Sequence, residues 1–291
     1  MLPMATKVSK KVLTPVVVPE KISRFPKLNY NTILVVLLVA ASFLIGRLSA
    51  QVEYLKGGTN VAAVPAVAPA AQQQQQQAPA TPEVSSEQIK ALFNGKNITF
   101  GDKNKKVVFV EYSDPSCPYC HVAGGKNPEL NKQIGTQFTV VADGGTYIPP
   151  VPEMKKLVDS GKAAFVWLYT NGHGNGEMAT KALYCAYEKG KFWQVHDTLM
   201  TNKGYDFINN TLKNDKTKSA ELAEFLKQVI SYNDMKNCLD GGKYDGRIAE
   251  DTGIAQSMAA SGTPHFFVNT TRFTGAYSYK DMESVVAVAL K

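Results

Sequence analysis

The chain has 291 residues, 44% of them hydrophobic and 20% charged, and a formal net charge of +7 at pH 7. This length and apolar content suit one globular domain with additional segments. Residues 1–27 hold six Lys or Arg and one Glu, which accounts for +5 of the charge, so the rest of the chain is nearly neutral. A nearly neutral body has no basic stripe for phosphates, and this excludes a nucleic-acid-binding protein.

An uncharged apolar segment, LNYNTILVVLLVAASFLIG, follows the basic tail at residues 28–46. As a helix it would be about 28 Å long, close to the roughly 30 Å hydrocarbon core of a bilayer. We predict a single transmembrane signal anchor over residues 28–50; cleavage as a signal peptide after Ala50 stays open. The Lys and Arg before the segment keep the N-terminus in the cytoplasm and export the rest of the chain.

Residues 51–84 are predicted to be a disordered linker. They are rich in Ala, Pro and Gln, with a Gln run at 72–77, and have few large side chains. Such a segment cannot bury enough surface to offset its conformational entropy. A linker of this kind serves to hold the folded domain to the membrane only if the anchor before it is kept, which favours an uncleaved anchor.

Residues 85–291 have the composition of a folded domain. We predict a short helix capped by Ser85 or Ser86, then buried strands over 106–114 and 163–170 with a helix over 151–161 between them. A helical block over about 175–255 precedes two short strands, PHFFVN and TRFTGA, which are joined near residues 269–271. A last helix follows the capping-box pattern of Ser278 and Asp281. This order predicts an α/β fold.

The stretch EYSDPSCPYCH places a C-x-x-C-H motif directly after the first buried strand. This motif also attaches c-type haem, but haem attachment needs an exposed helix beside a large apolar pocket, and the preceding buried strand argues against it. A zinc site is excluded because the other two cysteines, Cys185 and Cys238, are single and widely separated. We therefore interpret Cys117 and Cys120 as a redox pair that needs no bound cofactor.

Each residue of this motif has an expected role. A helix that begins at Cys117 would stabilise its thiolate through free backbone N–H groups and the helix dipole, so Cys117 is the predicted nucleophile. Cys120, one turn along, would resolve a mixed disulfide. Pro118 suits the first helical turn, and Tyr119 is expected to tune the N–H groups that reach the sulfur. His121 is expected to face solvent or lie near the thiolate, where its positive charge would favour ionised Cys117.

From about residue 98 to the C-terminus the chain resembles the DsbA-like thiol–disulfide oxidoreductases of the thioredoxin-fold superfamily. The resemblance rests on EYSDPSCPYC, on VPEMKKLVDSGKAAFVW followed by KALYCAYEKGKFWQVHDTLM, on SGTPHFFVN, and on an acid six residues before Cys117. It implies a thioredoxin fold over 85–291, with the helical block as an inserted subdomain. Residues 124–150 depart from the family pattern, and we interpret them as an extra loop beside the active site in which QFTVVAD is a candidate strand.

The resemblance implies roles for three further residues. Thr263 and Pro264 would be joined by a cis peptide bond packed against the cysteine pair, with their backbone offered to an extended substrate peptide. Without the resemblance, Pro264 reads as an ordinary first residue of a strand. Glu111 would be buried with a raised pKa and would accept the proton that Cys120 must lose; the alternative is an exposed acid at a strand end.

The remaining two cysteines, Cys185 and Cys238, both lie in the helical block. Because Cys117 pairs with Cys120 and the cysteine count of the exported part is even, we predict a structural disulfide between them. Two buried free thiols are the alternative.

Together these features predict a membrane-tethered monomer whose catalytic domain lies in the periplasm or at the cell exterior. It would introduce or exchange disulfide bonds in exported proteins. The family members with CPYC mostly donate disulfides, so the resemblance implies reoxidation by a quinone-coupled membrane oxidase of the DsbB or vitamin-K-epoxide-reductase type. Two alternatives stay open: a reductase or isomerase that uses the same pair, and a tethered chaperone or binding module whose cysteine pair is only structural.

Overall fold

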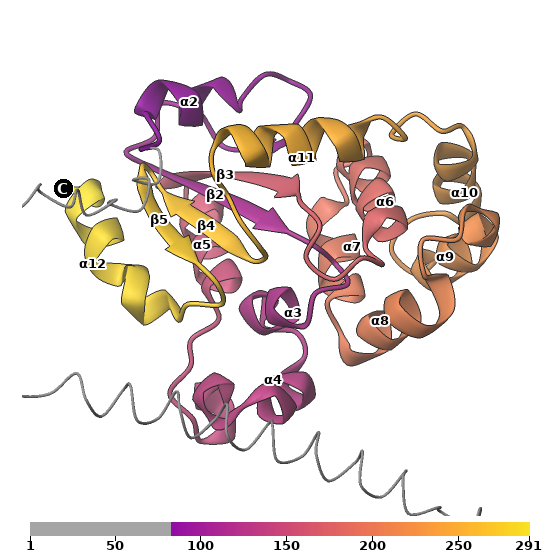
Figure 1. Cartoon of the computed structure of the whole chain (residues 1–291), viewed down its shortest axis with the longest axis horizontal. Helices are drawn as coiled ribbons and strands as arrows, with labels where there is room; N and C mark the ends of the chain where they lie inside the picture. Colours follow the sequence, from indigo (N-terminus) through magenta and orange to yellow (C-terminus); the bar gives the residue numbers. More distant parts are fainter. Residues whose placement is uncertain (1–82) are drawn as a thin grey trace, which may run out of the picture. The chain divides into compact units, whose positions relative to one another are not determined.

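The computed structural model describes residues 83–291 (Figure 1). The expected basic tail, the transmembrane anchor and nearly all of the linker lie outside the described residues. Within residues 83–291, no helix combines the length and the apolar character needed to cross a membrane.

A mixed five-stranded sheet in the order β1-β3-β2-β4-β5 runs through the centre of the domain (Figure 1). Its strands are β1 (Ile98–Phe100), β2 (Val107–Ser113), β3 (Ala163–Tyr169), β4 (His265–Val268) and β5 (Thr271–Thr274). β2 and β3 are parallel, and the other neighbouring pairs are antiparallel. β2 is the central strand and all of its residues are buried, which explains its nearly continuous apolar sequence.

Eleven α-helices surround this sheet within the described part of the chain. They are α2 (Ser86–Ala91), α3 (Pro118–Gly124), α4 (Pro128–Ile134), α5 (Pro150–Asp159), α6 (Glu177–Glu188), α7 (Phe192–Leu199), α8 (Asn202–Asp206), α9 (Ser219–Leu226), α10 (Tyr232–Asp240), α11 (Arg247–Ser257) and α12 (Tyr279–Leu290). Short 3-10 turns η1 (Thr136–Phe138), η2 (Val141–Asp143) and η4 (Lys216–Lys218) and one π-helical turn, η3 (Phe207–Leu212), complete the secondary structure. The capping boxes of α2, formed by Ser85 and Gln88, and of α12, formed by Ser278 and Asp281, fix where these two helices begin.

Side chains of β2 alternate between two apolar cores, because successive residues of a strand point to opposite faces. Val108 and Tyr112 belong to the core that α2 and α11 cover (Figure 1). Phe109 belongs to the larger core on the other face, which includes residues of α3, α5, α12 and the helical block. Glu111 and Ser113 lie two and four residues after Phe109, so their side chains point to the same face of the sheet. They are polar groups buried on that second face.

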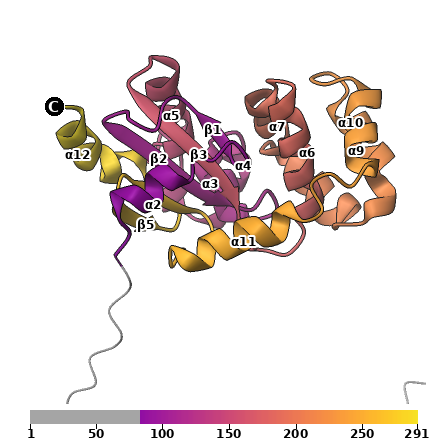
Figure 2. The same cartoon turned by 90° about the horizontal axis from the view of Figure 1, so that it is seen from above.

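The helical block lies between β3 and β4 in the chain and beside the sheet in space. Figure 2 shows α6, α7, α9 and α10 grouped at one side of the strands. The structure places Cys185 of α6 and Cys238 of α10 in a disulfide across this block, 53 residues apart in sequence. Cys117 and Cys120 are both free thiols.

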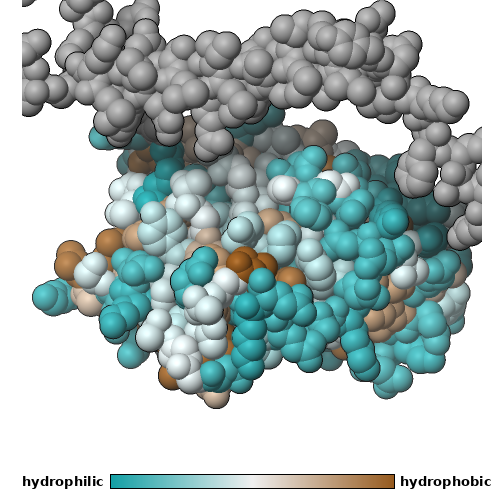
Figure 3. All heavy atoms as spheres, turned by 60° about the horizontal axis from the view of Figure 1, so that its bottom comes forward, coloured by the Kyte–Doolittle hydropathy of each residue, from teal (hydrophilic) through white to brown (hydrophobic). Residues whose placement is uncertain are grey.

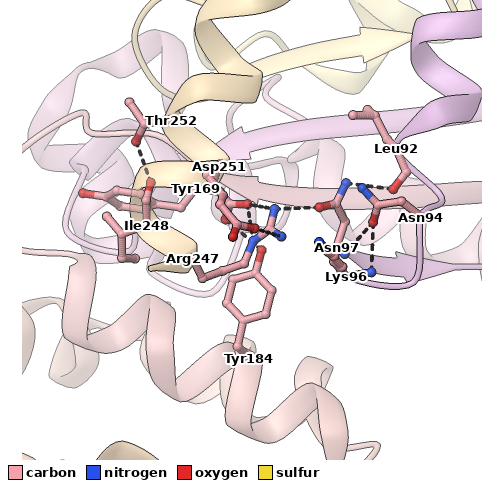
Figure 4. Close-up of polar contacts among 11 residues, drawn as sticks. Leu92, Asn94, Lys96, Asn97, Tyr169, Tyr184, Arg247, Ile248, Asp251 and Thr252 are labelled. Atoms are coloured by element: carbon pink, nitrogen blue, oxygen red, sulfur yellow. Dashed lines mark hydrogen bonds and ion pairs between the residues drawn. The ribbon is translucent and has the colours of Figure 1, made fainter. Parts of the chain in front are cut away.

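A buried ion pair joins α11 to the sheet and to α6 (Figure 4). Arg247 donates from Nε to Asp251 at 2.7 Å and from a terminal nitrogen to the side-chain oxygen of Asn97 at 2.6 Å. Asp251 also accepts hydrogen bonds from the Tyr184 hydroxyl, at 2.7 Å, and from the backbone N–H of Tyr169, at 3.1 Å. A buried charge pair is tolerated when its remaining hydrogen bonds are made. Here α6, β3 and the segment before β1 make them, which fixes the block against the sheet.

The structure corrects the expectation for residues 124–150. They are not an unstructured loop, because Asn127 caps α4 and Pro128 occupies its first turn. QFTVVAD is not a strand either: it forms the turns η1 and η2, and only Val140 makes an isolated bridge, to Tyr147. Gly144, at φ +83°, turns the chain back immediately after this segment, so an extended strand cannot continue.

Reducing the Cys185–Cys238 disulfide should destabilise the fold by about 4 kcal/mol in the chain-entropy model, since the bond closes a long loop. We would measure this with a Cys117→Ala/Cys120→Ala variant, in which reductant can act on this bond alone. Denaturant unfolding of that variant with and without reductant gives the difference without changing a side chain in the block. A difference below about 1 kcal/mol would show that the helical block does not depend on the bond.

Candidate active site

Cys117 and Cys120 lie where the central strand passes into α3. Cys117 is the N-cap of α3, and Pro118 occupies the first helical position. The backbone N–H of Cys117 donates to the carbonyl of Asp114 at 2.9 Å, which makes the junction a tight turn. Cys117 is 4% exposed and Cys120 is fully buried. The arrangement is the strand-to-helix junction expected from the sequence.

The two thiols differ strongly in acidity. The pKa of Cys117 is lowered to about 6, although burial acts in the opposite direction. The largest cause is a hydrogen bond from the Cys120 side chain. Smaller contributions come from the Thr263 side chain and from the backbone N–H groups of Cys120 and Tyr119. Burial, together with the neighbouring Cys117, raises the pKa of Cys120 well above its usual value. At pH 7 Cys117 is therefore a thiolate and Cys120 a thiol, which suits an attacking and a resolving cysteine.

The peptide bond between Thr263 and Pro264 is cis, and it lies against the cysteine pair. The Cys117 thiol lies 3.4 Å from the Thr263 carbonyl oxygen, the acceptor of its hydrogen bond. The Thr263 hydroxyl has no geometric hydrogen-bond partner among the described residues, so it is available to the Cys117 thiolate. The structure thus brings together the two segments that the sequence resemblance related, although they are 146 residues apart.

Glu111 is buried, 1% exposed, on the face of β2 that carries the larger core. Burial raises the pKa of its carboxyl above the ordinary value for glutamate. One of its oxygens, Oε2, has no hydrogen-bond partner within residues 83–291. Glu111 is therefore a buried carboxyl that holds its proton more strongly than an exposed glutamate does, as expected of a group that exchanges protons with Cys120.

The expectation for His121 is wrong in two respects. The side chain is completely buried rather than solvent-facing, and its ring nitrogens lie 2.9 Å from the carbonyl oxygens of Pro115 and Met200. Two carbonyls favour a doubly protonated ring, but burial opposes the charge more strongly and lowers the pKa of His121 to about 4. His121 is therefore neutral at pH 7 and supplies no positive charge to Cys117; it joins the active-site turn to the end of α7.

Asp114 is a site residue that the sequence analysis missed. Its carboxylate is completely buried and accepts hydrogen bonds from the backbone N–H and hydroxyl of Ser116, at 2.8 and 2.7 Å. It also accepts from the backbone N–H groups of Gly172 and His173, both at 2.9 Å. An Asp followed two residues later by a Ser is a pattern typical of a local turn, and it could have pointed to Asp114 in the sequence. Asp114 holds the turn before Cys117 to the loop between β3 and α6.

This loop, residues 171–176, forms a wall beside the cysteines and the cis-proline. A Cβ atom at Gly172 would lie 1.7 Å from the Thr263 hydroxyl oxygen, and one at Gly176 would lie 1.9 Å from an Asp114 carboxylate oxygen. Neither position has room for a side chain without a shift of the site. The loop therefore positions Thr263 by direct contact.

Residues 124–150 contribute aromatic surface next to the pair. Tyr119 is 44% exposed, and its ring packs edge-on against Phe138, which in turn contacts Tyr147. The Tyr147 hydroxyl donates to the carbonyl of Tyr277 at 3.3 Å. Figure 3, which turns this end of the domain forward, shows small hydrophobic patches among hydrophilic residues. The exposed apolar surface at this end is therefore local.

The chain is similar to several known proteins. A family model described as Thioredoxin matches residues 152–287, which include Pro264 and the helical block. A candidate protein-disulfide oxidoreductase of Rickettsia conorii is 24% identical over 225 residues, 77% of this chain and 69% of that protein. The Na⁺/H⁺ antiporter NhaA 3 of Salinispora tropica is 28% identical over 193 residues, 65% of this chain, but the chain spans only 24% of the antiporter's length.

Two solved structures establish the fold. Variants of Wolbachia pipientis α-DsbA1 match with a TM-score of 0.51 and 15% identity, covering 71% and 69% of this chain and 96% of α-DsbA1. The predicted α/β thioredoxin fold with a helical insertion is confirmed.

Alkylation of reduced protein by iodoacetamide should follow ionisation of Cys117. We expect the rate to rise with a midpoint near pH 6, whereas a free cysteine has a pKa of about 8.5. In a Cys120→Ala variant the midpoint should rise, because the largest cause of the low pKa is removed. A midpoint near 8.5 in the unaltered protein would contradict the thiolate.

Asp114→Asn should lower the free energy of unfolding by about 2 to 3 kcal/mol, because an amide places a donor against backbone N–H donors in a buried position. Asp159→Asn is the matched control: Asp159 is exposed on α5 and pairs with Lys155 at the surface, so less than about 1 kcal/mol is expected. Denaturant unfolding of both variants measures the difference. Equal effects would mean that Asp114 does not organise the junction.

Proposed function

We propose that this DsbA-like protein-disulfide oxidoreductase oxidises pairs of thiols in exported proteins, with Cys117 as the reacting sulfur and Cys120 as its resolving partner. The observation that carries the proposal is the asymmetry of the pair: Cys117 is acidic and borders the Thr263 backbone, while Cys120 is buried and weakly acidic. A sulfur that is stable as a thiolate is also a good leaving group. Reduction of the pair is thereby favoured, and the pair acts as an oxidant.

The reaction has two exchanges. A substrate thiolate attacks Cys117 in the oxidised pair, the bond between Cys117 and Cys120 breaks, and Cys120 leaves and takes up a proton. A second substrate thiolate then attacks the substrate sulfur of the mixed disulfide and releases Cys117 as a thiolate. Two electrons pass from the substrate thiols to the pair, and the substrate gains one disulfide.

The substrate would bind as an extended segment along the backbone at Thr263 and Pro264, as in strand addition. Tyr119, which lies between the two cysteines in sequence and is 44% exposed, and Phe138, on which its ring packs, offer apolar contacts. This arrangement suits an unfolded chain, which presents backbone and apolar side chains together.

The cellular setting belongs to the same proposal. The basic tail and apolar segment at residues 1–50 support a single-pass membrane protein with this domain outside the cytoplasm. The reduced pair would then be reoxidised by a quinone-coupled membrane oxidase of the DsbB or vitamin-K-epoxide-reductase type.

The reduction potential of the pair tests the direction of the reaction. The full chain, in detergent, is equilibrated in glutathione buffers, and free Cys117 is counted by alkylation. We expect a potential nearer to about −120 mV, the value of a strong oxidant, than to about −270 mV, the value of thioredoxin. A value near −270 mV would make the protein a reductant.

A Cys117→Ser variant tests whether the protein is an enzyme at all. The proposal requires that this variant lose oxidation of a reduced peptide dithiol, while Cys120→Ser accumulates mixed disulfides through Cys117. Full activity of Cys117→Ser in cells would instead support a binding module with a structural cysteine pair.

A further inference from the structure

The peptide group that joins Ser116 to Cys117 is held at both of its polar atoms. Its N–H, which belongs to Cys117, donates to the carbonyl of Asp114 at 2.9 Å. Its carbonyl oxygen, which belongs to Ser116, accepts from the side-chain amide of Asn209 at 3.1 Å. Ser116 is completely buried, and a buried carbonyl needs a donor. The plane of this peptide group therefore cannot rotate without loss of these hydrogen bonds.

Asn209 reaches this peptide group from the helical block. It is half-buried in η3, the π-helical turn that continues α8. Turns of this kind are rare and often occur at functional sites. Its Nδ2 also donates to the carbonyl of Tyr205 at 3.2 Å, and its Oδ1 accepts from the side-chain amide of Asn175, also at 3.2 Å. Both polar atoms of the Asn209 side chain thus have partners, which fixes the direction of the amide.

Asn175 closes a ring of hydrogen bonds with Ser116 and Asn209. Its backbone N–H donates to the Ser116 hydroxyl at 3.1 Å, and the same hydroxyl donates to the Asp114 carboxylate at 2.7 Å. Ser116 is thus bound through its hydroxyl by the loop of residues 171–176 and through its carbonyl by η3. A displacement of η3 would therefore act directly on the residue before Cys117.

The segment around η3 is attached to the site on both sides. Before it, the Tyr205 ring meets the edge of the buried His121 ring of α3, with the two ring centroids 4.9 Å apart. After it, Lys213 and Asn214 have positive φ angles of 44° and 59°, which are uncommon in residues other than glycine. The Asn214 side chain donates to the carbonyl of Gly174 at 2.8 Å. An uncommon backbone conformation thus occurs where η3 is joined to the wall of the site, and such conformations often accompany function.

We propose that Asn209 is a positioning residue for the reaction at Cys117, because it holds the preceding peptide group in the orientation that the thiolate requires. Hydrogen bonds to the Cys117 sulfur come first from the Cys120 side chain, and then from Thr263 and the start of α3. The sulfur meets these groups only while the backbone of Cys117 keeps its direction, which the peptide group before it sets. The proposal rests on the proposed function, in which Cys117 is the reacting sulfur.

Asn209→Ala tests this role in the full chain, in detergent. Loss of the amide frees one side of the peptide group, so the thiolate should lose part of its stabilisation. The pH midpoint of Cys117 alkylation should then rise by about half a pH unit. The equilibrium constant for oxidation of glutathione by the pair should fall about threefold at pH 7, because half a pH unit corresponds to about a threefold change. A role limited to stability would move neither quantity.

Asn210→Ala is the matched control. Asn210 is the next residue of η3, and its exposed side chain donates to Asp206 at 2.7 Å rather than to the active site. Neither the alkylation midpoint nor the equilibrium constant should change in this variant. Equal shifts in Asn209→Ala and Asn210→Ala would overturn the positioning role, and so would an unaltered midpoint in folded Asn209→Ala protein.

Thermal unfolding checks that Asn209→Ala folds, and Asn175→Ala provides a second test if it does not. Asn175→Ala removes the donor to Asn209 Oδ1 but keeps the backbone N–H that binds the Ser116 hydroxyl. A smaller upward shift of the alkylation midpoint is expected, and no shift would overturn the positioning role. Failure of the unaltered protein to oxidise a peptide dithiol would instead overturn the proposed function, which separates the two failures.

Discussion

The buried carboxylate of Asp114 is the constraint on which the rest of the site depends. A charge without access to water must find its hydrogen bonds in the protein, and Asp114 takes them from the turn before Cys117 and from the loop after β3. That loop in turn contacts Thr263. The Asp114 side chain thereby holds the end of β2, the turn before Cys117 and the loop of residues 171–176 beside the cis-proline in a single arrangement.

Burial raises the pKa of both cysteine sulfurs, and hydrogen bonds outweigh this effect only at Cys117. At Cys117 the hydrogen bonds lower the pKa, whereas at Cys120, one turn further in, burial and the neighbouring Cys117 raise it although its sulfur accepts a hydrogen bond from the Asp114 N–H at 3.4 Å. Their difference in acidity follows first from the hydrogen bond of the Cys120 side chain to Cys117, and then from Thr263 and the backbone N–H groups at the start of α3. The sheet contributes by placing β2 at its centre, where neighbours on both sides exclude water.

Much of this arrangement follows from local sequence signals. Continuous apolar runs mark β2 and β3, capping boxes mark the first residues of α2 and α12, and the spacing of Cys117 and Cys120 identifies the reactive pair. The burial of His121 and the full role of Asp114 did not follow, because each also has partners far away in sequence: Met200 lies 79 residues from His121, and Gly172 lies 58 residues from Asp114. Helix α4 was missed because the Gly-containing segment around it resembles a loop.

The disulfide in the helical block has a consequence for how the newly made protein matures. Cys185 is only 2% exposed, so its bond with Cys238 is shielded from solvent in the folded domain. With the proposed function, a protein that oxidises other chains would itself need an oxidant for this structural bond, in addition to the one that reoxidises Cys117 and Cys120. A chain made under reducing conditions would have a helical block without this covalent link between α6 and α10.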